Sequence, residues 1–119
     1  MLESAPFRLP AAPVDTDLVA KYFRGLGDPT RLRILELLRA EGELNVGELV
    51  ERLGVAQPTV SNHLACLRWC GFVEARRESR AVYNRIADER VSALLDLAGS
   101  LLADNAEHVA ACCRIGTTA

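Results

Sequence analysis

The sequence predicts a mainly α-helical domain that carries one small β-hairpin. Three observations support this fold class. The chain has 119 residues, half of them hydrophobic and a quarter charged, which suits one globular domain with a modest core. Apolar residues recur at helical spacing in five segments. Between Phe72 and Ile86 the apolar period changes to two, as in strands.

The first two helices follow a proline-rich start. Residues 1–16 hold three of the five prolines and are expected to form a flexible N-terminal arm. The apolar spacing over residues 18–26 predicts a first helix that ends near Gly25 or Gly27. An Asp-Pro pair at positions 28 and 29 then supplies a cap and a first-turn proline for a strongly apolar second helix, which should lie in the centre of the core.

Two short helices joined by a glycine turn come next. Asn45, with Glu48 three residues later, forms a capping box for a helix that stops at Gly54. Pro58 sits where a first-turn proline is tolerated, and the helix that it opens runs until Gly71. This arrangement predicts a helix-turn-helix.

A hairpin and a long helix complete the predicted fold. Segments Phe72–Arg76 and Ala81–Ile86 are expected to be strands around a polar turn at residues 77–80. Apolar residues then repeat at helical spacing from about Asp88 and continue toward Val109. A helix-turn-helix followed by a hairpin is a winged helix-turn-helix.

The order of elements also predicts the organisation of the chain. We expect the arm at 1–16, a winged helix domain for DNA binding and dimerisation at 17–110, and a C-terminal tail at 111–119. Because so small a core leaves limited stability, apolar helix faces should be completed by a second subunit, which predicts a homodimer. The start does not resemble a signal peptide, and charged residues interrupt every apolar stretch before the roughly 18 residues of a membrane span. The sequence therefore predicts a cytoplasmic protein with no membrane partner.

Charge distribution points to double-stranded DNA as a partner. The net charge is −2, but residues 57–85 carry +3, which leaves −5 for the rest of the chain. The second helix of a helix-turn-helix enters the major groove, where short polar and amide side chains can bond to base edges. The candidate readers on this helix are Gln57, Thr59, Ser61, Asn62 and His63. Arg77 and Arg80 at the wing tip are candidates for the minor groove or the backbone, and the alternative is that all these residues form a solvated surface.

Four cysteines form the second candidate site. Cys66 and Cys70 are one helical turn apart, away from the apolar face, so their sulfurs can point at one ion. Two more thiols, Cys112 and Cys113, lie beyond the last helix on a tail that could fold back or cross to a partner subunit. The alternatives are idle or buried thiols for both pairs. Trp69, between the first two cysteines, is expected to be a packing residue.

Three motifs carry a resemblance to a known family. They are Leu26-Gly27-Asp28-Pro29-Thr30-Arg31-Leu32-Arg33-Ile34-Leu35, Val46-Gly47-Glu48-Leu49 and Gln57-Pro58-Thr59-Val60-Ser61-Asn62-His63-Leu64. Over roughly residues 17 to 105 the chain resembles the ArsR/SmtB family of metal-responsive repressors. The resemblance implies a homodimer joined by its first and last helices, bound to an imperfect palindromic operator. One departure is Ser79, where the wing of this family often has glycine.

The segment around the first cysteine pair is similar to one branch of this family, the cadmium and lead sensors. In that branch a cysteine pair on the recognition helix is joined by a third cysteine from the C-terminal region of the opposite protomer. Cys66 and Cys70 match by position, and Cys112 or Cys113 matches only as a C-terminal cysteine. Two other metal sites of the family are not expected. The helix after Asn45 has no cysteine, and non-ligating residues stand where the last helix would need histidines.

The predicted function is a repressor released from DNA by a soft heavy-metal ion, with no organic cofactor. Three thiolates suit large, soft cations, and the resemblance implies cadmium or lead first, then mercury or trivalent arsenic. Within the same fold, the alternative is a thiol redox or persulfide switch that joins Cys66 or Cys70 to a tail cysteine. Outside it, the alternatives are a DNA-free interaction module or a small thiol enzyme with His63 as base. The enzyme is disfavoured because no oxyanion donors are identifiable.

Overall fold

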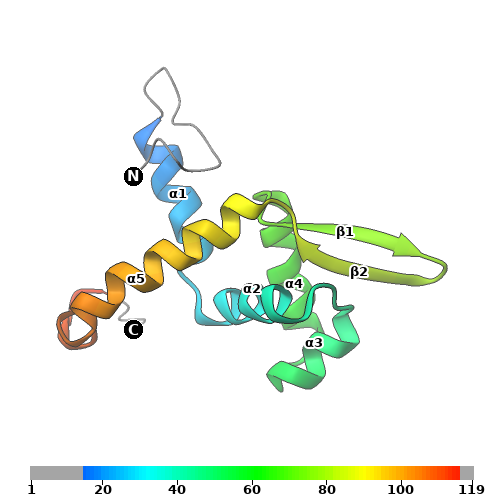
Figure 1. Cartoon of the computed structure of the whole chain (residues 1–119). Coiled ribbons are helices and arrows are strands. Elements are labelled where there is room, and N and C mark those ends of the chain that lie inside the picture. Colours follow the sequence, from blue (N-terminus) through cyan, green and yellow to red (C-terminus); the bar gives the residue numbers. More distant parts are fainter. Residues whose placement is uncertain (1–14, 116–119) are drawn as a thin grey trace.

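The computed structural model describes residues 15–115, which form five helices and a two-stranded hairpin (Figure 1). The elements are α1 (Thr16–Leu26), α2 (Pro29–Glu41), α3 (Val46–Leu53), α4 (Gln57–Trp69), β1 (Val73–Glu78), β2 (Ala81–Ile86) and α5 (Glu89–Ala111). The predicted fold class, a winged helix-turn-helix, is confirmed. Residues 1–14 of the expected arm and 116–119 of the expected tail lie outside the described residues.

Capping side chains start the helices where the sequence predicts. The Asp28 carboxylate accepts a hydrogen bond of 3.0 Å from the Arg31 backbone N–H, and Pro29 occupies the first turn of α2. The capping box of α3 is complete, because Asn45 Oδ1 accepts from the Glu48 N–H at 2.8 Å and Glu48 Oε1 accepts from the Asn45 N–H at 2.9 Å. Each bond satisfies a backbone donor that the first turn leaves without an intrahelical partner.

The core lies between α2, α3 and α4, and the hairpin and the start of α5 close it. Its buried side chains are Leu26, Ile34, Leu35, Leu38, Leu44, Leu49, Val60, Leu64, Leu67, Phe72, Val73 and Val91. Only the first turn of α5 contributes a buried residue, and Figure 1 shows the rest of this helix extending away from the helix-turn-helix. The central position predicted for α2 is confirmed.

The C-terminal end of α4 is fixed by a Schellman motif. Gly71 has the left-handed φ of 83°, its N–H donates to Arg68 O, and the Phe72 N–H donates to Leu67 O at 2.9 Å. The expected start of the first strand at Phe72 is therefore wrong by one residue, because the backbone of Phe72 completes the helix end. Cys70 becomes the C-cap, which holds it in place between α4 and the wing.

The wing is a tight antiparallel hairpin, with Val73 paired to Ile86 at its base and Glu78 paired to Ala81 at its tip. The expected second strand, Ala81–Ile86, is confirmed, but the expected four-residue turn at 77–80 is wrong, since β1 continues to Glu78 and only Ser79 and Arg80 connect the strands. Two-residue turns match the twist of a hairpin when φ is positive, and Ser79 has a φ of 57°. This is the position at which the sequence analysis noted serine in place of glycine.

Large apolar side chains remain exposed on the first and last helices. On α1 they are Leu18, Tyr22 and Phe23, and on α5 they are Leu97, Leu101, Leu102 and Val109. Exposed apolar side chains gathered on two helices are typical of an interaction face. Among the described residues, the helices include none with the length and apolar character needed to cross a bilayer.

Candidate DNA interface and thiol cleft

The turn between α3 and α4 presents the second helix of the motif. Gly54 ends α3 with a φ of 67°, a left-handed conformation that glycine adopts without strain, and its N–H donates to Val50 O at 2.9 Å. After Val55 and Ala56, α4 begins at Gln57, with Pro58 in its first turn. Buried Val60, Leu64 and Leu67 hold one face of α4 against the core. The opposite face is therefore presented to the surroundings.

The predicted readers on α4 fall into two groups. Gln57, Thr59 and Asn62 are exposed near the start of the helix, as a base-reading role requires. Ser61 is half-buried. These positions agree with a surface that faces DNA, while His63 lies elsewhere.

The side chain of His63 faces the corner between α1 and α2 and is only 19% exposed. Its Nδ1 lies 3.3 Å from Arg31 Nη1, and its Nε2 lies 3.8 Å from Asp28 Oδ2. Arg31 also donates from Nε to Gly25 O at 2.7 Å. His63 thus ties the recognition helix to the α1–α2 corner, which distinguishes it from the outward-facing side chains that were grouped with it. The sequence contains one signal for this contact. Asp28 and Arg31, which offer polar partners to a histidine, both lie at the start of α2, the helix that packs beside α4.

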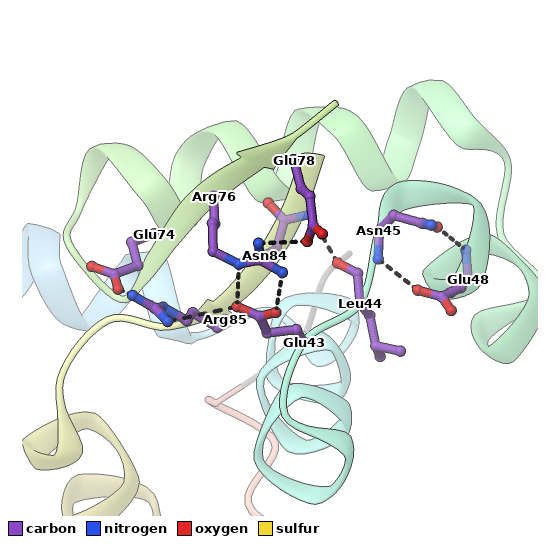
Figure 2. A network of polar contacts seen from close by, with 9 residues as sticks. All are labelled: Glu43, Leu44, Asn45, Glu48, Glu74, Arg76, Glu78, Asn84 and Arg85. Atoms are coloured by element: carbon purple, nitrogen blue, oxygen red, sulfur yellow. Dashed lines mark hydrogen bonds and ion pairs between the residues drawn. The ribbon is translucent and has the colours of Figure 1, made fainter. Parts of the chain in front are cut away.

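The arginines of the wing are also of two kinds. Arg76 donates to both carboxylate oxygens of Glu43, at 3.0 and 2.7 Å, and Arg85 lies within ion-pair distance of Glu43 and Glu74 (Figure 2). Hydrogen bonds from Arg76 hold the pKa of Glu43 below its usual value. These two arginines fix the wing to the segment before α3. Within residues 15–115, the exposed tip arginines, Arg77 and Arg80, form no ion pair.

A buried polar side chain joins the wing to the segment before α3 and to α4. Asn84 on β2 is fully buried and donates from Nδ2 to Leu44 O at 3.2 Å, and its backbone pairs with Leu44 in an isolated bridge (Figure 2). Its Oδ1 accepts a hydrogen bond of 3.2 Å from Arg68 Nη1 on α4. This role of Asn84 could not be predicted from the sequence, because an asparagine in a half-exposed strand gives no local sign of burial.

Cys66 and Cys70 lie together at the C-terminal end of α4 and line an open cleft against α1. Burial raises the pKa of the Cys70 thiol, and the adjacent Cys66 thiol raises it further. Cys70 Sγ lies 3.6 Å from the point where a Cβ on Gly25 would sit, so α1 packs closely against it. The predicted juxtaposition of these two thiols is present. Trp69 corrects an expectation, because it is 92% exposed at the rim of the cleft rather than packed.

The tail cysteines do not join this pair within the described protomer. Cys112 caps the C-terminal end of α5 and Cys113 follows it. Alpha5 starts beside the end of α4, where the Ala87 N–H donates to Phe72 O, and its 23 residues span about 34 Å at 1.5 Å each. Over residues 15–115, no cluster of three or more metal-ligating side chains is formed. His108, on the last turn of α5, lies on the same distant end.

These elements define a winged-helix DNA-binding protein. Residues 28–75 match the model of the bacterial regulatory proteins of the arsR family. A probable mercury resistance operon repressor of Streptomyces lividans is 46% identical over 99 residues, which cover 83% of this chain and 78% of that protein. The chain belongs to the arsR family. It is therefore a transcriptional regulator and not an enzyme, which removes the thiol-enzyme alternative.

Two further proteins support this placement. The HTH-type transcriptional regulator CmtR of Mycobacterium tuberculosis is 44% identical over 77 residues, 65% of this chain and 64% of that protein. The homodimeric winged helix-turn-helix domain of Mb0332 from Mycobacterium bovis, described as a possible ArsR-family regulator, has a TM-score of 0.70 and 36% identity. The match covers 83% of this chain and 95% of that one. The resemblance to a family of metal-responsive repressors is thus confirmed at the level of the family.

Proposed function

We propose that this chain is a homodimeric repressor that leaves its operator when a soft metal ion binds Cys66, Cys70 and a tail cysteine. The observation that carries the proposal is the position of the first two thiols. They lie side by side at one end of the recognition helix, whose other end carries the exposed polar readers. An ion bound there acts on the element that touches DNA.

Dimerisation through α1 and α5 is supported by their exposed apolar side chains. Leu18 and Leu101 are more than 60% exposed in the single protomer, a costly arrangement unless a partner covers them. Mb0332, which shares the fold, is described as homodimeric. A two-fold dimer presents two recognition helices to the two halves of a palindrome.

The third ligand is best supplied by the partner's tail. Within one protomer, Cys112 and Cys113 lie at the far end of α5 from Cys66 and Cys70. If two copies of α5 pair antiparallel around a two-fold axis, the end of one helix lies beside the start of the other. This brings the tail of one subunit toward the thiol cleft of its partner.

The ion belongs to the soft, thiophilic class. Two or three thiolates suit cadmium, lead, mercury or trivalent arsenic, whereas zinc prefers four ligands that include nitrogen. A relative that matches over most of both chains is named as a mercury resistance operon repressor, which adds weight to mercury(II) beside cadmium(II) and lead(II).

DNA contacts are assigned to the exposed groups at two places. Gln57, Thr59 and Asn62, with the half-buried Ser61, face base edges or phosphates from the start of α4, and Arg77 and Arg80 reach DNA from the wing. His63 acts indirectly by holding α4 against the α1–α2 corner. Metal that ties the partner's tail to the end of α4 disfavours the helix spacing that fits the operator. By linkage, the operator weakens metal binding by the same factor.

The test is a metal titration of reduced protein followed by operator binding at fixed salt. Thiolate-to-metal charge-transfer absorption is recorded for the wild type and for Cys66→Ser, Cys70→Ser, Cys112→Ser and Cys113→Ser, with cadmium, lead and mercury(II). The operator is a duplex selected in vitro. A weaker band in the first two variants, since each lacks one thiolate of the site, and weaker operator binding by the wild type with metal, are expected. Unchanged operator affinity with metal bound would refute derepression.

A mixed dimer decides between tail capture within and across subunits. One subunit carries Cys66→Ser with Cys70→Ser, and the other carries Cys112→Ser with Cys113→Ser. Capture across subunits leaves one complete site in this heterodimer, whereas capture within a subunit leaves none. Native mass spectrometry checks the thiol-switch alternative, because metal adds its mass and a disulfide removes two hydrogens.

A further inference from the structure

The cleft that holds the two thiols is larger than an ion requires. It is open to solvent and has a volume of about 610 Å³ between α1, the start of α2 and the end of α4. A water molecule, comparable in size to a metal ion, fills about 30 Å³, whereas small-molecule pockets enclose about 300–1,000 Å³. Besides the thiols and Trp69, the cleft is lined by Lys21, Arg24 and Arg31.

Three cationic side chains therefore surround the thiols. Arg31 is held in position by its bonds to Gly25 O and His63, and Lys21 and Arg24 are exposed on α1. Over residues 15–115 none of the three lies within ion-pair distance of a carboxylate, unlike Arg39, Arg52, Arg76, Arg85 and Arg90. Residues 111–119, which carry Cys112 and Cys113, contain Arg114 and no acidic side chain.

We propose that the cleft receives the metal as a complex with an anionic low-molecular-weight thiol, whose carboxylates bind Lys21 and Arg24, and that the ion then transfers to Cys66 and Cys70. This inference rests on the proposed function, since it names the form in which the inducing ion arrives. Soft ions among excess thiols exist as thiolate complexes, so a sensor must take the ion from them. Carboxylates on the carrier match the cations of the cleft.

The transfer is a ligand exchange with no change of oxidation state. Each bond between the metal and a carrier sulfur breaks as a bond to a cysteine sulfur forms. Each cysteine thiol gives its proton to the carrier thiolate that it displaces. One metal complex with two carrier thiolates and two cysteine thiols therefore become one protein-bound ion and two free carrier thiols. Arg31, on the inner side beside His63, balances negative charge on the sulfurs during the exchange.

Trp69 provides the measurement. It is the only tryptophan of the chain, and it stands exposed at the rim of the cleft, so its fluorescence reports occupancy by a heavy ion. Stopped-flow mixing at low salt compares mercury(II) bound to two mercaptosuccinates with mercury(II) bound to two cysteamines. The first carrier is anionic and the second cationic. The two carriers exchange their metal at different intrinsic rates. We therefore divide the transfer rate from the mercaptosuccinate complex by the rate from the cysteamine complex, and compare this rate ratio between protein variants.

The variants remove one positive charge each. In the wild type, this rate ratio should fall about tenfold from low salt to 1 M salt, because steering by the cleft charges is screened. Lys21→Gln and Arg24→Gln should each lower the ratio severalfold at low salt. Arg33→Gln is the matched control, since Arg33 is exposed on α2 outside this cleft and should leave the ratio unchanged.

The outcomes separate this inference from the proposed function. A rate ratio that is insensitive to salt, or equal losses in Lys21→Gln and Arg33→Gln, would overturn carrier recognition even if mercury(II) still binds the thiols. Failure of the wild type to give a thiolate charge-transfer band with mercury(II) chloride would overturn the proposed metal site itself, and the inference with it.

Discussion

The base of the wing and the thiol cleft treat their cationic side chains in opposite ways. At the wing, Arg76 and Arg85 are paired with Glu43, Glu74 and Glu78 (Figure 2). At the cleft, the three cationic side chains Lys21, Arg24 and Arg31 lie beyond ion-pair distance of any carboxylate in residues 15–115. Charges paired within the chain set its geometry, and charges left over are available to an outside partner. The ion pairs give the first region a structural role, and we propose a recognition role for the second.

The two regions should differ most in their response to pH. Burial and the neighbouring Cys66 raise the pKa of the Cys70 thiol, so it is protonated at neutral pH and metal must displace the proton. Metal affinity should therefore fall as pH falls, by about tenfold per pH unit for each proton released. At the wing the pKa of Glu43 is lowered and that of Arg76 is raised, so this pair stays charged from pH 6 to 8.

Competition titrations with a chelator of known proton stoichiometry, at pH 6, 7 and 8, measure this slope. Calorimetry in buffers of different ionisation heat counts the released protons independently. A metal affinity that is flat over this range would mean that the thiols are already ionised in the cleft, which would contradict the contrast between the two regions.

A smaller effect, on the free energy of unfolding, is expected when the side-chain hydrogen bonds of the buried Asn84 are removed. Asn84→Ala removes the side-chain hydrogen bonds to Leu44 O and from Arg68 Nη1, while the backbone N–H of residue 84 still donates to Leu44 O, so the free energy of unfolding should fall by about 1–2 kcal/mol. Urea denaturation at one fixed protein concentration measures it, since dimers gain stability with concentration. Asn62→Ala, at an exposed position of α4, is the control and should change little in the absence of DNA. Equal losses in both variants would remove Asn84 from the structural region.

Local signals explain how much of this region could be predicted. Asp28, Asn45 with Glu48, Gly54 and Gly71 each act on their own helix end, so the sequence alone located all the helices closely. The hairpin was expected with a turn two residues too long, because serine gives a weaker turn signal than glycine at a positive φ.

Contacts between distant segments could not be predicted in the same way. Lys21 and Arg24 come from α1 and Arg31 from α2, and only packing of these helices beside α4 makes one cationic cleft of them. The same packing turns His63 inward and leaves Trp69 exposed. The thiol pair was predictable because a spacing of four residues in one helix fixes the proximity of its side chains.

Within the wing, the contrast between paired and unpaired arginines can be tested with one type of substitution. Arg80→Gln removes an exposed tip charge and should lower operator affinity severalfold, reducing the slope of log affinity against log salt by about 1 if Arg80 contacts a phosphate. Arg85→Gln removes a charge that is already paired and should leave the slope unchanged. Fluorescence anisotropy at several salt concentrations provides the slopes. Identical slopes for both variants would show that ion pairing does not decide which arginines meet DNA.

The smallest expected effect lies at the tip of the wing, where the backbone is strained. Ser79 has a φ of 57°, and the left-handed conformation costs an L-residue about 1–2 kcal/mol. Glycine removes that cost but loses about 0.5–1 kcal/mol through its freer unfolded chain, so Ser79→Gly should stabilise the protein by about 0.5 kcal/mol. Ser100→Gly within α5 has no such strain to relieve and should destabilise it by about as much. Opposite signs in urea denaturation of the two variants would show that the wing is held firmly enough at its base to keep its tip strained. The same sign would mean that the backbone of Ser79 leaves the left-handed conformation, and that the ion pairs at the base of the wing do not fix the backbone at its tip.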